Sequence, residues 1–498
     1  MKSSLYISME RIQTNMNKLA PAVLMERGEE KTSIEKKRRS RDSGSSDQSG
    51  HRRSSEPGSQ VCYGNPEIRV FKQKIDITEY GLKDPETLLP HMRETENQAD
   101  FHVCHRCQNR NQDLFFLYQG HWYCRKCLDF GPLEAGQWPR KPKLSHKTWT
   151  GHPKLEFELM PFQKEASTKA LDALKRGKDV LVYAAAGAGK TEISMESICW
   201  YLARGKKVCF AISRRQVVME IAKRLAQSFP DLDVIPVCEG YTKVTDADLI
   251  VCTTHQLYRY PFCFDLLILD ELDAFPYAGN EVLEAIAAQS CTGQKMLLSA
   301  TPDEKSLQAI EQGKMEMVNL FKRPHEKPLC VPKVIRAGKF LMVLHILANC
   351  RRFIRQNKQV LLFVPRIADT TWMKLVVSIF FRCEVIHSKS ADKDEIMARF
   401  HEKKTMVLIC TTLLERGITV PSVQVIVYRA DHPVFTKASL IQIFGRAGRS
   451  FKDPEGEGIA LVSTVSKNLQ ECIRQLRYMN AASGVEAQST HAKASRPL

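Results

Sequence analysis

With 498 residues, the chain is too long for a single hydrophobic core, and we expect about three folded units. No window holds about 18 uninterrupted apolar residues, which argues against a transmembrane helix, and residues 1–20 lack the apolar core of a secretory signal. We therefore expect a cytoplasmic protein, whose formal net charge of +17 favours a polyanionic partner such as nucleic acid or an anionic membrane face.

The first 60 residues are rich in serine and in basic residues and contain almost nothing that a core could bury. Such a composition predicts a disordered tail over 1–60. Residues 61–99 show no clear pattern, so only a poorly defined N-terminal segment is predicted there.

Four of the 16 cysteines form a CxxC-x16-CxxC pattern, at Cys104, Cys107, Cys124 and Cys127. Two such pairs can place four thiolates tetrahedrally around Zn²⁺, and a site without an open position holds the metal for structure rather than catalysis. Disulfides, the alternative, are disfavoured in a reducing cytoplasm. We predict a four-cysteine zinc module over 100–130, followed by a linker over 131–153.

Two features of this module leave alternatives open. His105 and His121 are alternative metal ligands, although four cysteines are sufficient. The apolar and aromatic run 114–118, with Trp122 and Tyr123, either stacks on nucleic-acid bases or forms the core of the small module.

From about residue 154, short β-branched runs alternate with longer amphipathic stretches, which is the βαβ rhythm of a parallel sheet. A first lobe is predicted over 154–322 and a second over 334–482, joined by a linker over 323–333 that contains three prolines. The expected strands are 179–183, 207–212, 248–253, 265–269 and 295–299 in the first lobe and 359–364, 383–387, 405–410, 423–428 and 458–462 in the second. The end of the chain, 483–498, is small and polar, and we expect a flexible tail.

The first strand leads into Ala184-Ala-Ala-Gly187-Ala-Gly189-Lys190-Thr191 and then into a helical run. Small residues let backbone N–H groups close around phosphates, Lys190 would reach the β- and γ-phosphates, and the Thr191 hydroxyl would hold Mg²⁺. Ala184 stands where the pattern G-x-x-x-x-G-K-[ST] has its first glycine, which is the one mismatch. The strand–loop–helix context predicts nucleotide binding.

An acidic motif follows about 80 residues later, where the largely apolar run 264–269 ends in Asp270 and Glu271. Asp270 would orient Mg²⁺, and Glu271 could polarise the attacking water as a general base. The alternative is a solvated acidic turn, but the position of the acids directly after an apolar strand favours a nucleotide site.

Near the end of the second lobe, Gln442 is followed by Arg446 and Arg449. Two arginines three residues apart lie on one helical face or in a turn against it. If they face a γ-phosphate, they would act as arginine fingers, which raise hydrolysis rates by roughly 10³–10⁵. Taken alone, an ordinary basic turn would explain this motif better.

Taken in order, these motifs resemble those of superfamily 2 DExD/H-box helicases and translocases. The matching positions are Gln163, 184–191, 212–215, 253–257, 270–273, 299–301, 362–365, 410–417 and 442–449. The resemblance implies an α/β fold of two RecA-like lobes with parallel sheets, preceded here by a small four-cysteine zinc-ribbon module. It also implies ATP and Mg²⁺ in the cleft between the lobes.

The same resemblance implies a role for each group of residues. The ATP ligands would be Gln163, Ala184, Gly187, Gly189, Lys190, Thr191, Gly417 and Gln442, with Thr191 and Asp270 at the Mg²⁺. The catalytic residues would be Lys190, Asp270, Glu271, Arg446 and Arg449, while Ser299 and Thr301 would couple hydrolysis to motion. The contacts to a DNA strand would come from Arg214, Arg215, Thr253, Thr254, Thr411 and Thr412. Contacts to the backbone carry no sequence information, which suits a translocating motor.

A zinc module directly before such a motor, together with the runs 270–277 and 414–421, is similar to the ComFA family of late competence helicases in Gram-positive bacteria. The similarity covers about residues 100–480. It implies a cytoplasmic ATPase, stimulated by single-stranded DNA, that pulls transforming DNA through a membrane channel. It also implies a phosphoribosyltransferase-like partner and a place at the inner face of the cell membrane, where the chain would be peripheral at most.

Three alternative functions would account for the same motifs in different ways. A PriA-like primosomal helicase also joins zinc cysteines to this motor, but it carries them within the helicase body. A DEAD-box RNA helicase fits less well, because the acidic motif is Asp-Glu-Leu-Asp and the last motif begins with Gln442 rather than histidine. A non-catalytic, zinc-dependent DNA-binding adaptor would have no need of an intact Lys190 and Asp270.

Overall fold

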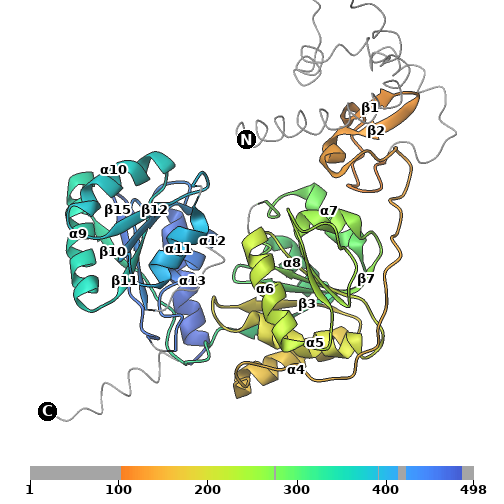
Figure 1. Cartoon of the computed structure of the whole chain (residues 1–498), viewed down its shortest axis with the longest axis horizontal. Coiled ribbons are helices and arrows are strands. Elements are labelled where there is room, and N and C mark those ends of the chain that lie inside the picture. Colours follow the sequence, from red (N-terminus) through yellow and green to blue (C-terminus); the bar gives the residue numbers. More distant parts are fainter. Residues whose placement is uncertain (1–102, 274–275, 391, 413–421, 452, 485–498) are drawn as a thin grey trace, which may run out of the picture. The chain divides into compact units, whose positions relative to one another are not determined.

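The computed structural model describes residues 103–273, 276–390, 392–412, 422–451 and 453–484. The predicted segments 1–60 and 61–99, all but two residues of the predicted tail 483–498, and the predicted nucleotide ligand Gly417 lie outside the described residues. The contacts between residues divide the chain into two compact units. The boundary in the sequence lies between Arg140 and Lys141, and each unit is described by itself (Figure 1). No helix within the described ranges is long and apolar enough to cross a membrane.

The first unit is built around a two-stranded antiparallel hairpin. Its elements in chain order are η2 (Gln112–Leu114), β1 (Phe115–Tyr118), β2 (His121–Cys124) and η3 (Arg125–Phe130). Gln119 and Gly120 form the two-residue turn with φ of 49° and 84°, as a tight hairpin turn requires. Phe115 is buried, whereas Trp122 and Tyr123 are half-buried, so the aromatic residues contribute to the core of this unit while keeping part of their surface exposed.

The second unit begins with a lobe made of a seven-stranded sheet, which we call the first lobe. Its elements are α4 (Pro161–Lys175), β3 (Asp179–Ala184), α5 (Lys190–Leu202), β4 (Val208–Ile212), α6 (Arg215–Ser228), β5 (Val234–Val237), β6 (Leu249–Thr253), η4 (Thr254–Arg259), β7 (Phe264–Asp270), α7 (Glu281–Ser290), β8 (Cys291–Ser299), α8 (Glu304–Glu311) and β9 (Met315–Leu320). The strand order is β5-β6-β4-β7-β8-β3-β9, and all neighbours are parallel. The loops that follow β3, β4, β6, β7 and β8 therefore lie along one edge of the sheet.

The strands of this lobe are apolar along almost their whole length because both faces of the sheet are covered. Val182 and Phe210 pack in the same hydrophobic cluster as residues of α4, α5 and α6. On the other face, Leu181 and Leu297 line a cavity together with Ala287 of α7. Continuous apolar runs such as 266–269 are thus the expected sequence of doubly covered parallel strands.

The second lobe holds a six-stranded parallel sheet with the order β10-β15-β14-β11-β13-β12. Its elements are β10 (Lys333–Arg336), α9 (Lys339–Arg355), β11 (Gln359–Phe363), α10 (Ile367–Ser378), β12 (Cys383–Ile386), α11 (Lys393–His401), β13 (Val407–Cys410), β14 (Val423–Val427), α12 (Lys437–Phe444), β15 (Gly458–Val462) and α13 (Lys467–Ala482). α9 and α10 pack on one face of the sheet, and α11, α12 and α13 pack on the other (Figure 1). The α/β fold with two parallel sheets is therefore confirmed.

All ten expected strands are present, with ends displaced by up to four residues, and the described parts of the two lobes contain three further strands that were not predicted. β5 and β9 form the two edges of the first sheet, and β10 forms an edge of the second. β5 contains a proline, and β9 and β10 are only partly buried. Short, half-exposed edge strands lack the apolar run by which a central strand is recognised.

The end of the segment predicted as a linker over 131–153 is fixed to the first lobe. Trp149 is buried against Phe229, with ring centroids 5.4 Å apart, and its backbone N–H donates to the carbonyl of Leu202 at 3.1 Å. The buried Nζ of Lys207 donates to the carbonyl of Ser145 at 2.8 Å and to Asp246 at 2.9 Å. Residues 145–149 thus form a strap on this lobe rather than a free connection.

Candidate functional site

The phosphate loop (184–191) joins the carboxyl end of β3 to the N-terminus of α5. Gly187 and Gly189 have φ of 81° and 90°, a region that glycine enters without strain, and Gly189 is the N-cap of α5. Ala184 is the last residue of β3 and pairs with Leu320. The first position of the motif therefore lies in extended backbone, which explains why alanine can replace glycine there.

Lys190 and Asp270 meet at the edge of the sheet although they are 80 residues apart in sequence. Nζ of Lys190 lies 3.2 Å from Oδ1 of Asp270, and their side chains are only 14% and 10% exposed. Thr191, directly after Lys190, is buried. A hydroxyl and a carboxylate at the N-terminus of a helix are the oxygen donors that Mg²⁺ and phosphate sites use.

Glu271 leaves β7 with an unusual backbone conformation. Its φ is 58°, which is uncommon for a residue with a Cβ, and its N–H donates to Oδ1 of Asp270 at 2.8 Å and to the carbonyl of Leu298 at 3.2 Å. Such strain is held by the surrounding structure and is typical of functional sites. The turn keeps the carboxyl groups of Asp270 and Glu271 at the same edge as the phosphate loop.

A hydrogen-bond chain links the acidic motif to the end of β8. Oγ1 of Thr301 donates to Oδ2 of Asp273 at 2.7 Å, and the N–H of Thr301 donates to Oγ of Ser299 at 3.0 Å. β8 lies between β7 and β3 in the sheet, so this chain runs beside the phosphate loop. The two predicted coupling residues, Ser299 and Thr301, are thereby tied to the acidic motif.

Gln163 is buried and uses both ends of its side-chain amide. Nε2 donates to the carbonyl of Ala188 in the phosphate loop at 2.8 Å, and Oε1 accepts from the N–H of Met160 at 3.0 Å. A Cβ at Gly189 would also collide with this amide. The structure places Gln163 against the phosphate loop, where it fixes the loop's shape.

The predicted arginine fingers lie in the turn after α12, which we call the arginine turn (445–449). Gln442 and Arg446 are buried. Arg449 reaches the phosphate loop, because a Cβ at Gly187 would lie 3.4 Å from its Nε. Within the described part of the chain this Nε has no hydrogen-bond partner. Burial lowers the pKa of Arg449, and the nearby carboxylate of Glu271 acts in the opposite direction.

Sequence reasoning missed Arg323, which belongs to the segment predicted as the interlobe linker. Its side chain is 1% exposed and contacts the carbonyls of both the phosphate loop and the arginine turn. The segment 322–333 showed prolines and no periodicity, so a buried arginine in it could not be recognised. The apolar residues interrupted by Glu316 and Asn319 over 315–320 were the one signal in the sequence that regular structure continues nearly to this point.

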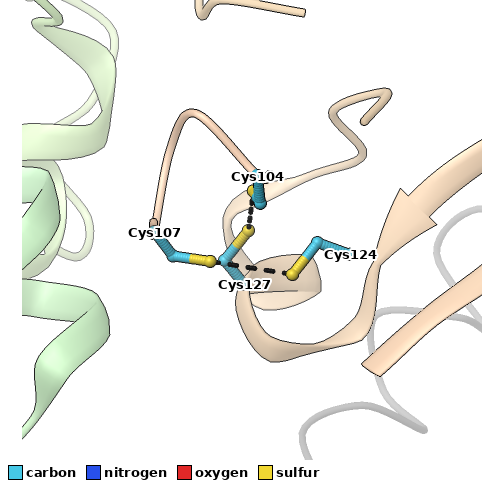
Figure 2. Close-up of side chains that lie close together, drawn as sticks. All are labelled: Cys104, Cys107, Cys124 and Cys127. Atoms are coloured by element: carbon cyan, nitrogen blue, oxygen red, sulfur yellow. Dashed lines mark hydrogen bonds between the residues drawn. The ribbon is translucent and has the colours of Figure 1, made fainter. Parts of the chain in front are cut away.

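In the first unit, the four predicted cysteines come together (Figure 2). Their sulfur atoms all lie within 4.8 Å of one another, with Cys104 and Cys127 3.5 Å apart and Cys107 and Cys124 3.6 Å apart. Four sulfurs at tetrahedral zinc positions are about 3.8 Å apart. All four residues are buried, so the cluster has the size and closure of a structural zinc site.

The charges of the cluster also suit a cation. The hydrogen bond from Cys107 lowers the pKa of the Cys104 thiol, whereas the hydrogen bond with Cys104 raises the pKa of Cys127. Four sulfurs this close therefore titrate as one group, and a divalent cation would stabilise the thiolate forms of all four. His105 stacks on Trp138 at 4.0 Å and His121 lies 2.7 Å from Glu134, so neither histidine belongs to the cluster.

Comparison with known proteins gives the family. Residues 160–310 match the DEAD/DEAH box helicase family, and residues 338–451 match the helicase conserved C-terminal domain. The competence protein ComFA of Streptococcus pneumoniae is 32% identical over 436 residues, which cover 84% of this chain and 98% of that protein. The chain belongs to the ComFA family of DEAD/DEAH-box helicases.

A second ComFA protein, from Bacillus subtilis, is 30% identical over 76% of this chain and 85% of its own length. A solved structure of RecG bound to a three-way DNA junction aligns with a TM-score of 0.48 at 19% identity, over 69% of this chain and 47% of that chain. Both helicase domains of the ComFA-family chain are present, which implies ATPase and helicase activity with ATP and Mg²⁺.

The residues predicted to contact nucleic acid differ in exposure. Arg214 is half-buried as the N-cap of α6, and Arg215 is exposed, with its Nε donating to the carbonyl of Glu239 at 2.9 Å. Thr253 and Thr411 are 9% exposed, and Thr254 is 1% exposed. Thr412 is half-buried. In this conformation of the ComFA-family helicase, the arginines and Thr412 are the more accessible members of the set.

Proposed function

We propose that the chain is an ATP-driven, single-stranded DNA translocase that pulls transforming DNA into the cell during competence. The observation that carries this proposal is the 32% identity to a competence protein over 98% of that protein's length. The meeting of Lys190 and Asp270 at the sheet edge supports the ATPase part of the proposal independently of any relative.

In this proposal each residue of the site has a defined task. The backbone N–H groups of the phosphate loop and Lys190 hold the phosphates, and Thr191 with Asp270 holds Mg²⁺. Bound ATP supplies a phosphoanhydride bond whose cleavage releases free energy. Glu271 orients and deprotonates the attacking water, and Arg449, with Arg446, stabilises the charge that develops.

The remaining tasks concern the DNA and the metal. Arg214, Arg215 and Thr412, with the less exposed threonines, hold the strand through its backbone, so that movement does not depend on sequence. The four cysteines hold one structural Zn²⁺. The motor works in the cytoplasm at the inner face of the membrane, beside an uptake channel and a phosphoribosyltransferase-like protein. These partners are proposed on the family relationship alone.

The decisive experiment measures steady-state ATP hydrolysis without nucleic acid and with single-stranded DNA, duplex DNA or single-stranded RNA. We expect strong stimulation by single-stranded DNA and a loss of at least about 100-fold in the Lys190→Ala variant, because no other residue can replace the phosphate contact of Lys190. The variant's thermal transition should stay within a few degrees of the wild type.

Equal or greater stimulation by RNA would contradict the DNA translocase and favour RNA remodelling. No hydrolysis under any condition would favour a DNA-binding adaptor. Transformation provides the cellular test, since a strain carrying Lys190→Ala that still takes up DNA at the normal frequency would refute the uptake role.

A further inference from the structure

Arg323 occupies an unusual environment three residues after β9. Its guanidinium group donates four hydrogen bonds, and every acceptor is a backbone carbonyl. The acceptors are Ala186 at 2.9 Å, Gly445 at 2.9 Å, Ala447 at 2.9 Å and Gly448 at 2.8 Å. Ala186 belongs to the phosphate loop, and the other three belong to the arginine turn. One side chain thus joins two motifs that are more than 250 residues apart.

None of the four groups that accept hydrogen bonds from the Arg323 guanidinium is a carboxylate. Burial, and next the charge of Arg449, lower the pKa of Arg323 to about 9. A buried charge is costly unless hydrogen bonds satisfy it, and charge-assisted bonds to four carbonyls supply that compensation. Only a planar guanidinium has five donors in a fixed fork, so lysine could not reproduce this arrangement.

The bonds also fix the orientation of the peptide groups. In a planar trans peptide the C=O and N–H bonds point in opposite directions. Because the carbonyls of Ala186 and Gly448 point at Arg323, the N–H groups of Gly187 and Arg449 point away from it. Arg323 therefore sets the direction of one N–H in the phosphate loop and of the backbone that carries Arg449.

Further contacts show how closely the two motifs approach one another. A Cβ at Gly445 would lie 2.7 Å from the Cβ of Ala186, so a larger residue could not stand there. At Gly187, a Cβ would lie 3.4 Å from Nε of Arg449 and 3.6 Å from Nε of Arg323. His325, two residues after Arg323, adds a bond of 2.9 Å from Nε2 to the carbonyl of Gly448.

We propose that Arg323 is a positioning residue that holds the arginine turn on the phosphate loop and thereby places Arg449 for ATP hydrolysis. The inference deepens the proposed ATPase and rests on it. Arg323 acts through the backbone carbonyls rather than on the nucleotide, so it should affect the rate of hydrolysis more than the binding of ATP. It also makes the segment after β9 a part of the site instead of a passive linker.

The test compares Arg323→Lys and Arg323→Gln with Arg352→Lys, a matched control in which an exposed arginine paired with Glu457 is changed. We expect Arg323→Lys to lower kcat by at least about 10-fold while the KM for ATP changes less than about 3-fold. The control should match the wild type. In a double-mutant cycle, Arg323→Lys should cost little more once Arg449→Ala is present, because both changes remove the same function.

If the double variant lost kcat by the product of the two single-variant losses, the proposal would be overturned. A wild-type kcat in Arg323→Lys would overturn it as well. A loss of kcat that is matched by a lowered thermal transition would indicate a merely structural role and would also count against it. Hydrogen exchange in the nucleotide-free protein separates this inference from the ATPase itself. Exchange over 445–447, whose N–H groups donate to the carbonyls of Ile441, Ile443 and Phe444, should quicken at least about 10-fold in Arg323→Gln but not in the control, even if hydrolysis were undetectable. Unchanged exchange would refute the contact.

Discussion

Thr301 connects two motifs through a single hydrogen bond, from its Oγ1 to Oδ2 of Asp273 at 2.7 Å. The bond is half-buried and uses the short polar side chain of a residue two positions after the end of β8. If the acidic motif moves when phosphate leaves, Thr301 passes that movement to β8 without itself touching the reacting atoms. Its removal should therefore separate hydrolysis from movement.

We predict that Thr301→Ala keeps ATP turnover within about 3-fold of the wild type and lowers strand displacement or translocation by at least about 10-fold. Thr292→Ala is the matched control, because Thr292 lies near the other end of the same strand and is exposed. Both activities should be measured on the same preparations. A parallel fall in hydrolysis and movement would contradict a coupling role.

His325 provides a pH-dependent contact beside Arg323, at the carbonyl of Gly448. Its Nδ1 accepts from the N–H of Lys327 at 3.1 Å, so Nε2 carries the proton and donates to the carbonyl of Gly448. Burial, and next the charge of Arg323, lower the pKa of His325 below its usual value of about 6.5. Protonation would place a second, half-buried cation beside Arg323.

Because the folded state resists this protonation, the unfolded chain takes up the proton first as the pH falls. We predict that stability is fully present above about pH 6.5 and falls as the pH decreases from there toward the lowered pKa of the folded state. Urea unfolding at pH 7.5 and pH 5.5 should show a smaller loss for His325→Gln than for the wild type. His432, whose pKa burial also lowers, is present in both proteins and cancels. An equal loss in both proteins would count against this role of His325.

At the scale of single residues, the sequence revealed those whose chemistry is unusual for their position. Lys190 after a glycine pair and Asp270 after an apolar strand are recognisable because a charge at such a place needs a reason. Arg323 was missed, since an arginine beside a proline in a polar segment resembles any surface residue. Its burial depends on carbonyls 122 to 137 residues away, and only the folded chain brings them together.

At the scale of elements, the hairpin of β1 and β2 shows how a metal can replace a core. Cys124 ends β2, Cys127 lies in η3, and Cys104 and Cys107 precede β1, so the cluster joins every part of the hairpin unit (Figure 2). Few apolar side chains here are fully buried apart from Phe115 and the cysteines. A unit this small has little hydrophobic stabilisation of its own.

We predict about one zinc per chain, and a loss of most of it in Cys127→Ser. The remaining three sulfurs cannot close a four-coordinate site, and proteolysis within 103–130 should then become faster. Cys199→Ser, a change at a half-buried thiol in α5, is the matched control and should keep the metal. Metal analysis of active protein that finds no zinc would remove the assignment.

The elements also show where sequence patterns lose their information. β14 and β15 are buried over their whole length, and both were predicted from their apolar runs. β10 has no buried residue and was not predicted as a strand; its first residue, Lys333, was assigned to the linker over 323–333 and the other three to the second lobe. Edge strands are fixed by pairing with a neighbour, in this case β15, and that pairing cannot be predicted from the local sequence.

At the scale of the whole molecule, the chain combines two parallel sheets with a strongly basic composition. The alternation of short β-branched runs with longer amphipathic stretches was sufficient to predict both sheets, and several motifs, such as 184–191 and 270–273, stand at the carboxyl end of a strand. The close packing of the arginine turn on the phosphate loop could not be predicted, since it depends on glycines that permit backbone approach.

The net charge of +17 leads to a prediction about salt. Phosphate contacts by Lys and Arg release counterions, so affinity for single-stranded DNA should fall with a log–log slope of about −0.7 per phosphate contacted. A footprint of about six phosphates would weaken binding roughly 300-fold between 50 and 200 mM salt. Fluorescence anisotropy with a labelled oligonucleotide measures the slope. A slope near zero would indicate that DNA is held mainly by stacking.

The position of β3 has a consequence for the synthesis of the protein. β3 lies between β8 and β9, and the partners of Val180, Met296 and Glu316, are translated more than 100 residues after it. At about 5–20 residues per second, the ribosome needs roughly 5–25 s to provide them. During that time an apolar strand with two unpaired edges is exposed on the nascent chain. We therefore expect the strand that leads into the phosphate loop to need protection by chaperones during synthesis, and a pause in translation before residue 296 would prolong its exposure.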